Sequence, residues 1–322
     1  MIKRGDGNIP VLYARGKSIP EAWENSIVRL YQEGLLWNRG DIKDQGKPVL
    51  DSSMTMIITN PDSDLFFHKY MIASCRPEDL FAYQMEILGA KDSWVHTEPG
   101  STKWSYHYHE RLADYPGVNG LVDQIQKAID SLAKEKWKKR QNIITWVPER
   151  DFDAPDPPCL QSLWFSIVPD ELTGDDSFVF NMNYRFRTRN VMIASPMNMI
   201  GLNTLDSYVI DKVKEKSGIK LRKGRIVDST DTYHVSGQYS HLLSGFIEWL
   251  QASKQRGETI EDRCLTREST LVGMNKEAIM ADLLEQTKKE LVEKREYTDR
   301  RFEEETAKVR GISEEVSRIN GY

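Results

Sequence analysis

Apolar residues recur at helical spacing in several parts of the chain, and this pattern predicts its main helices. Residues 19–34 (IPEAWENSIVRLYQEG) carry the pattern and end at Gly34. Further helices are predicted over about 77–89, 120–139, 197–217 and 239–254. The segment 120–139 is the clearest amphipathic one, with apolar residues at Leu121, Ile125, Ala128, Ile129 and Leu132.

Segments rich in β-branched and aromatic residues predict strands between these helices. The strands are predicted over 49–60, 142–148, 160–168, 178–189 and 219–235. Residues 151–159 (DFDAPDPPC) contain three prolines, which predict a non-helical loop directly before Cys159. The whole pattern predicts an α+β fold, with helices packed around a mixed or mostly antiparallel sheet.

The character of the chain changes near residue 274, where helix formers and opposite charges at helical offsets take over. We therefore predict one main domain over 1–270 and a charged helical extension over 271–322. The extension is either a partner-binding arm or a surface helix folded back on the domain, and the second interpretation is favoured.

The composition excludes several classes of function. The 322 residues are 39% apolar and 29% charged, which is typical of a globular protein, and the net charge is −5. No large basic block is present, so we expect no nucleic-acid partner, whereas a few arginines suffice to hold a small anion. The sequence has no signal-peptide core and no membrane-spanning apolar run, so we expect a cytoplasmic protein without a membrane partner.

The three cysteines, Cys75, Cys159 and Cys264, are few, odd in number and widely spaced. They form neither a disulfide framework nor a CxxC zinc motif, and they fit a reducing compartment. His107 and His109 would share one face of a strand, as metal ligands can, but no third ligand accompanies them. We therefore expect no metal, and interpret them as part of a solvated or nucleotide-facing loop.

Cys159 is the strongest candidate for chemistry, although a lone intracellular cysteine is usually a small buried apolar residue. The strand at 178–189 carries Arg185, Arg187 and Arg189 at alternate positions, which predicts that all three share one face. Such a face would suit an anion, and a guanidinium beside the thiol would lower its pKa. Paired carboxylates would satisfy the same arginines, so this pattern alone is only suggestive.

The order of motifs adds a resemblance to a known family. The chain reads VDQI at 122–125, then Lys139-Arg140, a strand ending in Trp146, PPC, RFRTRN, SPMN and DTYHVSG. This order resembles the thymidylate synthase family, whose signature runs Tyr-Gly…Arg, IDQI, Arg-Arg, PCH, RSxD, PFN and HxY. The resemblance covers roughly residues 20–255 and implies a thymidylate synthase-like fold.

Residue by residue, the resemblance implies a nucleophile and a phosphate clamp. Cys159 matches the cysteine that attacks C6 of a pyrimidine. Arg187 and Thr188 match the residues that bind the nucleotide phosphate. Lys139 and Arg140 match the arginine pair that reaches the phosphate of the partner subunit, which implies a homodimer with shared active sites.

Other positions match residues that contact the base, the sugar or folate. Asn198 matches the asparagine that reads the pyrimidine edge, and Tyr106 matches the tyrosine of the Tyr-Gly…Arg element. His234 and Ser236 fall on the HxY positions, where the histidine contacts a sugar hydroxyl. Trp104 lies where the family has folate-stacking aromatics, although core packing is the alternative.

The match departs from the family at several pocket positions. Leu160 replaces the histidine of PCH, Asn190 replaces the aspartate that contacts the folate pterin, and Ser236 replaces the tyrosine of HxY. The catalytic glutamate has no clear counterpart, because alignment of the helix ends at Gly89 puts Ala82 there. Glu78 and Glu86 lie one turn to either side.

The resemblance implies one-carbon transfer from 5,10-methylenetetrahydrofolate to C5 of a pyrimidine nucleoside monophosphate, as part of nucleotide biosynthesis. The altered pocket favours hydroxymethylation of CMP or dCMP, although the known deoxycytidylate members carry aspartate where this chain has Asn198. Methylation of dUMP, the thymidylate synthase reaction, is the alternative. A nucleotide-binding homologue without catalysis is the third hypothesis.

Overall fold

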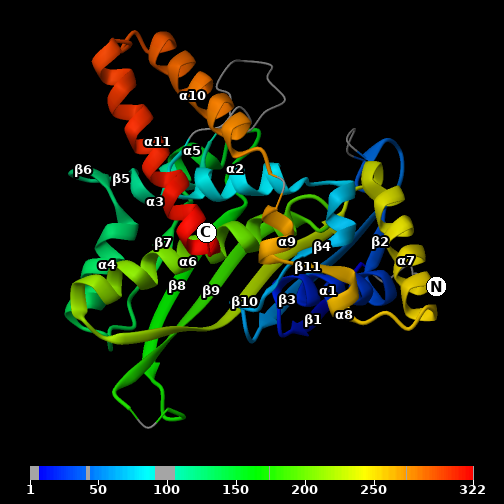
Figure 1. Ribbon diagram of the computed structural model, residues 1–322. Coiled ribbons are helices and arrows are strands. Elements are labelled where there is room, and N and C mark those ends of the chain that lie inside the picture. Colours follow the sequence, from blue (N-terminus) through cyan, green and yellow to red (C-terminus); the bar gives the residue numbers. More distant parts are fainter. Residues whose placement is uncertain (1–6, 41–43, 91–105, 174, 273, 322) are drawn as a thin grey trace.

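The computed structural model describes residues 7–40, 44–90, 106–173, 175–272 and 274–321. Within these residues, a mixed sheet in the order β1-β3-β10-β9-β8-β7 forms the centre of the molecule, and β2 also pairs with β3 (Figure 1). The strands are β1 (Val11–Gly16), β2 (Leu35–Trp37), β3 (Val49–Ile58), β7 (Asn142–Ile144), β8 (Leu160–Pro169), β9 (Ser177–Asn190) and β10 (Lys220–Val235). This confirms the predicted fold class.

Strand directions bring distant parts of the sequence to one edge of this sheet. β10 runs parallel to β9, so the carboxyl ends of both strands lie together, and His234 pairs with Asn190. β8 runs antiparallel to β9, so the start of β8 meets the end of β9, and Leu160 pairs with Phe186. The loop that carries Cys159 therefore opens next to the ends of β9 and β10.

Helices cover the sheet and place its core. α1 (Ile19–Glu33) begins where the Ser18 side chain accepts a hydrogen bond from the backbone of Glu21 at 3.3 Å, and it buries Trp23 and Ile27. α6 (Ser195–Ser217) starts just after β9, and most of its first four turns is buried. The direct step from β9 into α6 places the first turn of α6 at the edge where Cys159 lies.

The remaining elements are short or peripheral. They are β4 (Leu65–His68), η2 (Lys69–Ala73), α2 (Pro77–Ile87), α3 (Tyr108–Ala113), β5 (Tyr115–Gly117), β6 (Gly120–Val122), α4 (Gln124–Lys134), α5 (Pro148–Asp151), η3 (Gly237–Tyr239), α7 (Ser240–Gln255), α8 (Ile260–Arg263), β11 (Cys264–Thr266) and α9 (Arg267–Leu271).

The chain ends in a helical hairpin, α10 (Lys276–Glu293) and α11 (Asp299–Asn320), whose turn points away from the sheet (Figure 1). The base of the hairpin packs on α2 in a second apolar cluster, which includes Phe81, Met85, Leu283, Val309 and Val316. The side-chain amides of Gln84 and Asn320 also exchange hydrogen bonds, each 3.2 Å long. The extension is thus helical, as predicted, and folds back onto the main body.

Two predicted elements differ from the structure. The helix predicted over 120–139 spans only Gln124–Lys134, because the Asp123 side chain accepts a hydrogen bond from the backbone of Gln126 at 2.8 Å and caps the helix there. Leu121 lies instead in β6 and is 72% exposed. The strand predicted over 142–148 ends at Ile144, because Pro148 begins the short helix α5.

Candidate active site

Cys159 lies at the end of the proline-rich loop, immediately before β8. Residues 152–159 form no helix or strand, as predicted. The backbone N–H of Arg187 donates to the carbonyl of Cys159 at 2.9 Å, which extends the pairing of β8 and β9 as far as the cysteine. The sulfur atom is therefore positioned by two paired strands rather than by a free loop.

The guanidinium of Arg187 is fastened beside this sulfur. Its Nε donates to the carbonyl of Pro158 at 3.0 Å, and its Nη2 donates to the carbonyl of Pro157 at 2.6 Å. Nη2 also lies 3.9 Å from Sγ of Cys159. Nη1 makes no hydrogen bond to any residue that the structure describes, so this part of the fork can still bind an anion.

Two buried tyrosines hold the other side of the cysteine. The hydroxyl oxygen of Tyr106 accepts a hydrogen bond from the backbone N–H of Cys159 at 3.3 Å. The hydroxyl of Tyr108 accepts one from the backbone N–H of Leu160, also at 3.3 Å. Tyr106, a site residue predicted from the sequence, thus lies directly against Cys159, whereas Tyr108 was missed.

The pKa of the Cys159 thiol is raised overall, although Arg187 acts to lower it, as predicted. Burial raises the pKa of Cys159, and this outweighs the opposite effect of Arg187, while Asp156 raises the pKa further. The physical reason is that Arg187 gives its short hydrogen bonds to two proline carbonyls and reaches the sulfur only at 3.9 Å. Cys159 is therefore mainly a neutral thiol at pH 7.

The three arginines of β9 do not share one face, contrary to the prediction. Arg185 is exposed and bonds Asp231 at 3.3 Å on the open side of the sheet. Arg189 is 2% exposed and forms a bidentate ion pair with Asp228 on the core side. Only Arg187 lies beside the cysteine, so the paired-carboxylate alternative holds for the other two.

A shift in the strands explains this change of face. The pairing of β10 with β3 shifts between Thr230 and Tyr233, and both of these residues are buried although they are three positions apart. β9 follows β10 in parallel register through this region, so Phe186 and Arg189 are also both buried. Alternation along β9 is therefore broken between them.

The ends of β9 and β10 bring four predicted residues together. Thr188 Oγ1 lies 3.3 Å from Nδ1 of His234, and Asn190 Nδ2 donates to Oγ of Ser236 at 3.5 Å. Asn190 Oδ1 accepts a hydrogen bond from the backbone of Met192 at 3.0 Å. Burial lowers the pKa of His234, so this group of side chains is neutral at pH 7.

Asn198 lies in the first turn of α6 and contacts a residue that the sequence did not single out. Its Nδ2 donates to the hydroxyl oxygen of Tyr83 at 2.7 Å. Tyr83 belongs to α2, and its electrostatic neighbours include Tyr108 and Arg189, which connects it to the cysteine side of the site. Helical periodicity placed Tyr83 on α2 but did not show which face of α2 meets α6.

The same face of α2 carries a buried carboxylate. Glu86 Oε1 lies 3.4 Å from Nδ1 of His107, and both residues are 7% exposed. Ala82 packs instead with the apolar cluster under the hairpin, and Glu78 lies in the first turn of α2. Of the three positions considered for the family's glutamate, Glu86 is the one that places a buried carboxylate next to Tyr83.

The two histidines of the YHYHE segment do not form a strand pair. His107 is the N-cap residue of α3 and pairs with Glu86, whereas Nδ1 of His109 lies 3.0 Å from the carbonyl of Ile87. Both are mostly buried, so a solvated loop is also excluded. The structure contains no group of three metal-ligating side chains within the described ranges.

The structure does not bring the predicted basic pair to Cys159. Lys139 and Arg140 are exposed in the loop before β7, which pairs with the distant part of β8, where Asn142 is opposite Trp164. At about 3.3 Å per residue this places the basic pair roughly 15 Å or more along the strand from Cys159. Trp104, the predicted folate-stacking residue, lies outside the residues that the structure describes.

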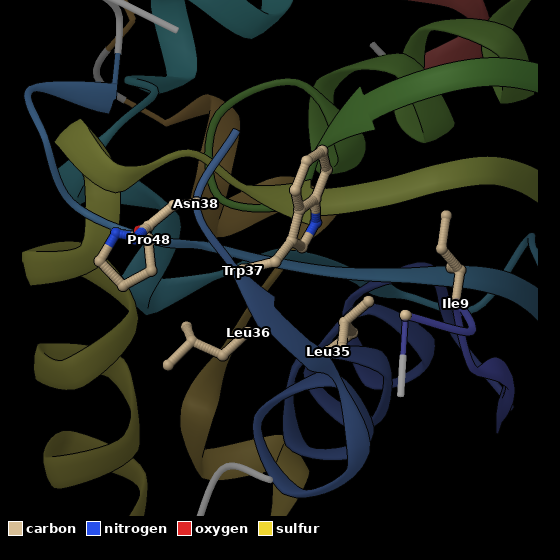
Figure 2. Close-up of a pocket in the computed structure, with 7 residues that line it drawn as sticks. Ile9, Leu35, Leu36, Trp37, Asn38 and Pro48 are labelled. Atoms are coloured by element: carbon tan, nitrogen blue, oxygen red, sulfur yellow. The ribbon is translucent and has the colours of Figure 1, made fainter. Parts of the chain in front are cut away.

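Two surface grooves lie apart from the Cys159 cluster. One, of about 460 Å³, lies beside β2 (Figure 2) and is lined by Gly7, Ile9, Leu35, Leu36, Trp37, Asn38 and Pro48. Another of similar volume lies between α6 and the end of α11, with Lys223, Arg267 and Arg318 among its lining residues.

No helix in the described part of the chain has the length and hydropathy needed to cross a membrane.

Comparisons with known proteins agree with this geometry. A protein of Methanococcoides burtonii named "Putative thymidylate synthase" is 27% identical over 202 residues, which cover 62% of this chain and 80% of that protein. Its namesake from Methanosarcina mazei is 26% identical over 208 residues, covering 64% and 83% respectively. No protein-family model matches the chain.

A solved structure shares the fold. The thermostable thymidylate synthase A from Bacillus subtilis superposes with a TM-score of 0.51 at 16% sequence identity. The match covers 72% of this chain and 84% of the other. The mixed sheet and its surrounding helices are therefore the arrangement found in that enzyme.

Proposed function

We propose that this chain, which belongs to the thymidylate synthase family, transfers a one-carbon unit to C5 of a pyrimidine nucleoside monophosphate. The observation that supports the proposal most strongly is Sγ of Cys159 at 3.9 Å from the guanidinium of Arg187, with one nitrogen of that guanidinium left for an anion. A phosphate held there would fix the pyrimidine ring relative to the sulfur, which turns binding energy into orientation.

The reaction needs a nucleophile because C5 of a pyrimidine is itself unreactive. Addition of the Cys159 thiolate to C6 forms an Sγ–C6 bond and moves the π electrons of C5–C6 onto the ring, so that C5 becomes nucleophilic. When C5 has gained its one-carbon unit and lost its proton, expulsion of Cys159 restores the double bond.

The one-carbon unit would come from 5,10-methylenetetrahydrofolate, a co-substrate of the family. The residues that the resemblance assigns to folate fit it only in part. Asn190 carries no charge, and its amide is engaged by Met192 and Ser236, so it offers the pterin less than an aspartate would. Trp104 lies outside the described residues and supports neither outcome.

This weakened pterin contact favours hydroxymethylation over methylation. Methylation needs a hydride from folate, and a displacement of about 1 Å can slow such a transfer roughly a hundredfold. Hydroxymethylation needs only a water molecule to add to the one-carbon unit on C5, with release of tetrahydrofolate and no change of oxidation state. Water imposes no comparable demand on alignment, so we propose it as the final acceptor.

We propose CMP as the first substrate and dCMP as the second. Ser236 is smaller than the tyrosine of the family motif, and it lies next to His234 at the end of β10. A small side chain there leaves room for a ribose 2′-hydroxyl. The residue type at Asn198 leaves the base open, because an amide offers one donor and one acceptor and its orientation decides which base it pairs with.

We also propose a homodimer in which each subunit completes the site of the other. The exposed Lys139 and Arg140 lie far along β8 from the cysteine of their own chain, which suits a role at a neighbouring phosphate. Along the central part of β9, the residues that alternate with the buried core are only partly buried, which leaves this face of the sheet available for a second subunit.

The test is incubation with 5,10-methylenetetrahydrofolate and each of CMP, dCMP, UMP and dUMP, with products identified by mass. We expect a hydroxymethyl product from a cytosine nucleotide, tetrahydrofolate rather than dihydrofolate, and no turnover by a Cys159→Ala variant that still binds nucleotide. Stoichiometric dihydrofolate formed with dUMP would support a thymidylate synthase instead. Nucleotide binding without any product would support the non-catalytic alternative.

A further inference from the structure

Tyr83 is held in place by a backbone feature of α6. A Cβ atom added to Gly201 would lie 2.6 Å from Cε1 of the Tyr83 ring, closer than real contacts allow. Gly201 is three residues after Asn198, so the turn of α6 that carries Asn198 also provides the surface on which the ring lies. The same turn of α6 therefore sets the position of the Tyr83 ring and provides the 2.7 Å hydrogen bond from Asn198 to the Tyr83 hydroxyl.

The hydroxyl of Tyr83 accepts this hydrogen bond in a buried setting. Burial raises the pKa of Tyr83 most, and the neighbouring Tyr108 and Glu86 raise it further, so the hydroxyl keeps its proton at neutral pH. Because Nδ2 of Asn198 donates to this hydroxyl at 2.7 Å, the amide nitrogen lies toward Tyr83 and the amide oxygen lies away from it.

We propose that Tyr83 determines whether the site prefers cytosine or uracil, by fixing the orientation of the Asn198 amide. This inference rests on the proposed function, in which Asn198 faces the pyrimidine. Uracil presents a donor at N3 and an acceptor at O4, whereas cytosine presents an acceptor at N3 and a donor at its 4-amino group. Rotation of an amide by 180° exchanges its donor and acceptor, so a fixed amide discriminates between the bases and a rotating amide does not.

The test compares Tyr83→Phe with the wild type in calorimetric titrations of the whole protein with CMP, UMP, dCMP and dUMP. The ratio of dissociation constants between the two bases should narrow by roughly threefold to tenfold, the effect of one hydrogen bond. The ratio between ribose and deoxyribose should stay unchanged, because Tyr83 acts only on the base. General loosening of the site would weaken all four nucleotides together and leave the base ratio as it was.

Two further variants make the result specific. Gly201→Ala keeps the tyrosine but displaces its ring, and should narrow the base ratio in the same way. Tyr70→Phe is the matched control, because its hydroxyl donates to the carbonyl of Leu242 at 3.0 Å on another part of the fold, and it should leave the ratio unchanged.

The possible outcomes separate this inference from the proposed function. A wild type that binds none of the four nucleotides contradicts the proposed function itself. A wild type without base preference, or a Tyr83→Phe variant that keeps the full preference, overturns the role of Tyr83 and leaves the proposed function intact.

Discussion

Replacing Asp228 with leucine should destabilise the fold far more than an ordinary surface substitution, because Arg189 would then be buried without its partner. The two side chains are 0% and 1% exposed, and the guanidinium also lies 4.1 Å from the ring centre of Phe186. Removing one member of such a pair costs about 3–5 kcal/mol of unfolding free energy. Arg189→Met, which leaves the Asp228 carboxylate buried alone, should cost a similar amount.

The double variant Arg189→Met/Asp228→Leu should recover most of this loss. Two apolar side chains of similar volume remove both buried charges, and such exchanges are often neutral or stabilising by about 1–4 kcal/mol. We therefore expect the double variant to unfold within about 1 kcal/mol of the wild type. Urea unfolding, followed by circular dichroism and tryptophan fluorescence, measures all four proteins, and coincident transitions establish that one free energy describes each.

Nucleotide binding then tests the assignment of the two arginines. The double variant should keep its affinity for CMP or dUMP, because Arg189 faces Asp228 and not the cysteine. Arg187→Ala should weaken binding at least about tenfold, the effect of a lost hydrogen bond to a charged group. If the double variant loses as much affinity as Arg187→Ala, then Arg189 belongs to the anion site and the change of strand face is wrong.

Two further predictions concern the thiol and the assembly. Because burial raises the pKa of Cys159, its reaction with iodoacetamide should accelerate about tenfold per pH unit from pH 7 to 9. Mass spectrometry of the labelled peptides should show Cys75 and Cys264 unreacted, since burial raises the pKa of each to about 12. A reaction rate of Cys159 that levels off below pH 8 would contradict the raised pKa of its thiol. Mixing a Cys159→Ala chain with an Arg140→Ala chain should restore part of the activity in heterodimers with shared sites, whereas a fully active monomer in sedimentation would exclude them.

Much of the fold could be predicted because the long periodic segments outweigh local uncertainty. α1, α6 and β10 follow their hydrophobic patterns to within about two residues. The error at 120–123 has a visible cause, since Gly120 and the capping residue Asp123 interrupt a pattern that periodicity alone continues through Leu121. A capping signal therefore gives a better boundary than apolar spacing.

The order of motifs predicted which residues lie near Cys159, but it could not predict the positions that depend on tertiary packing. Cys159, Arg187 and Tyr106 lie together in the structure, and the roles that the resemblance gives them stay a prediction. The burial of Arg189 depends on a shift in strand pairing that no residue type announces. The position of Tyr83 depends on which face of α2 meets α6, and a sequence does not specify the rotation of one helix against another.

The hairpin α10–α11 raises a last question, which is whether it is an independent arm or part of the cooperative fold. Leu283 on α10 is 1% exposed and lies in the same apolar cluster as Phe81 and Met85 of α2. Leu283→Ala should cost about 2–5 kcal/mol, because it leaves a cavity against α2. Val292 on the same helix is 55% exposed, so Val292→Ala is the matched control and should have little effect.

Hydrogen exchange of residues 77–87 measures whether the lost stability of Leu283→Ala extends from the hairpin to α2. If the hairpin is part of the cooperative fold, Leu283→Ala should lower amide protection across α2 as well as α10, because Leu283 belongs to the apolar cluster that includes Phe81 and Met85 of α2. Tyr83 and Glu86 lie on that helix, so nucleotide affinity should fall with the protection. Loss of protection confined to the hairpin, with α2 unchanged, would instead identify 271–322 as an arm that unfolds separately from the catalytic body.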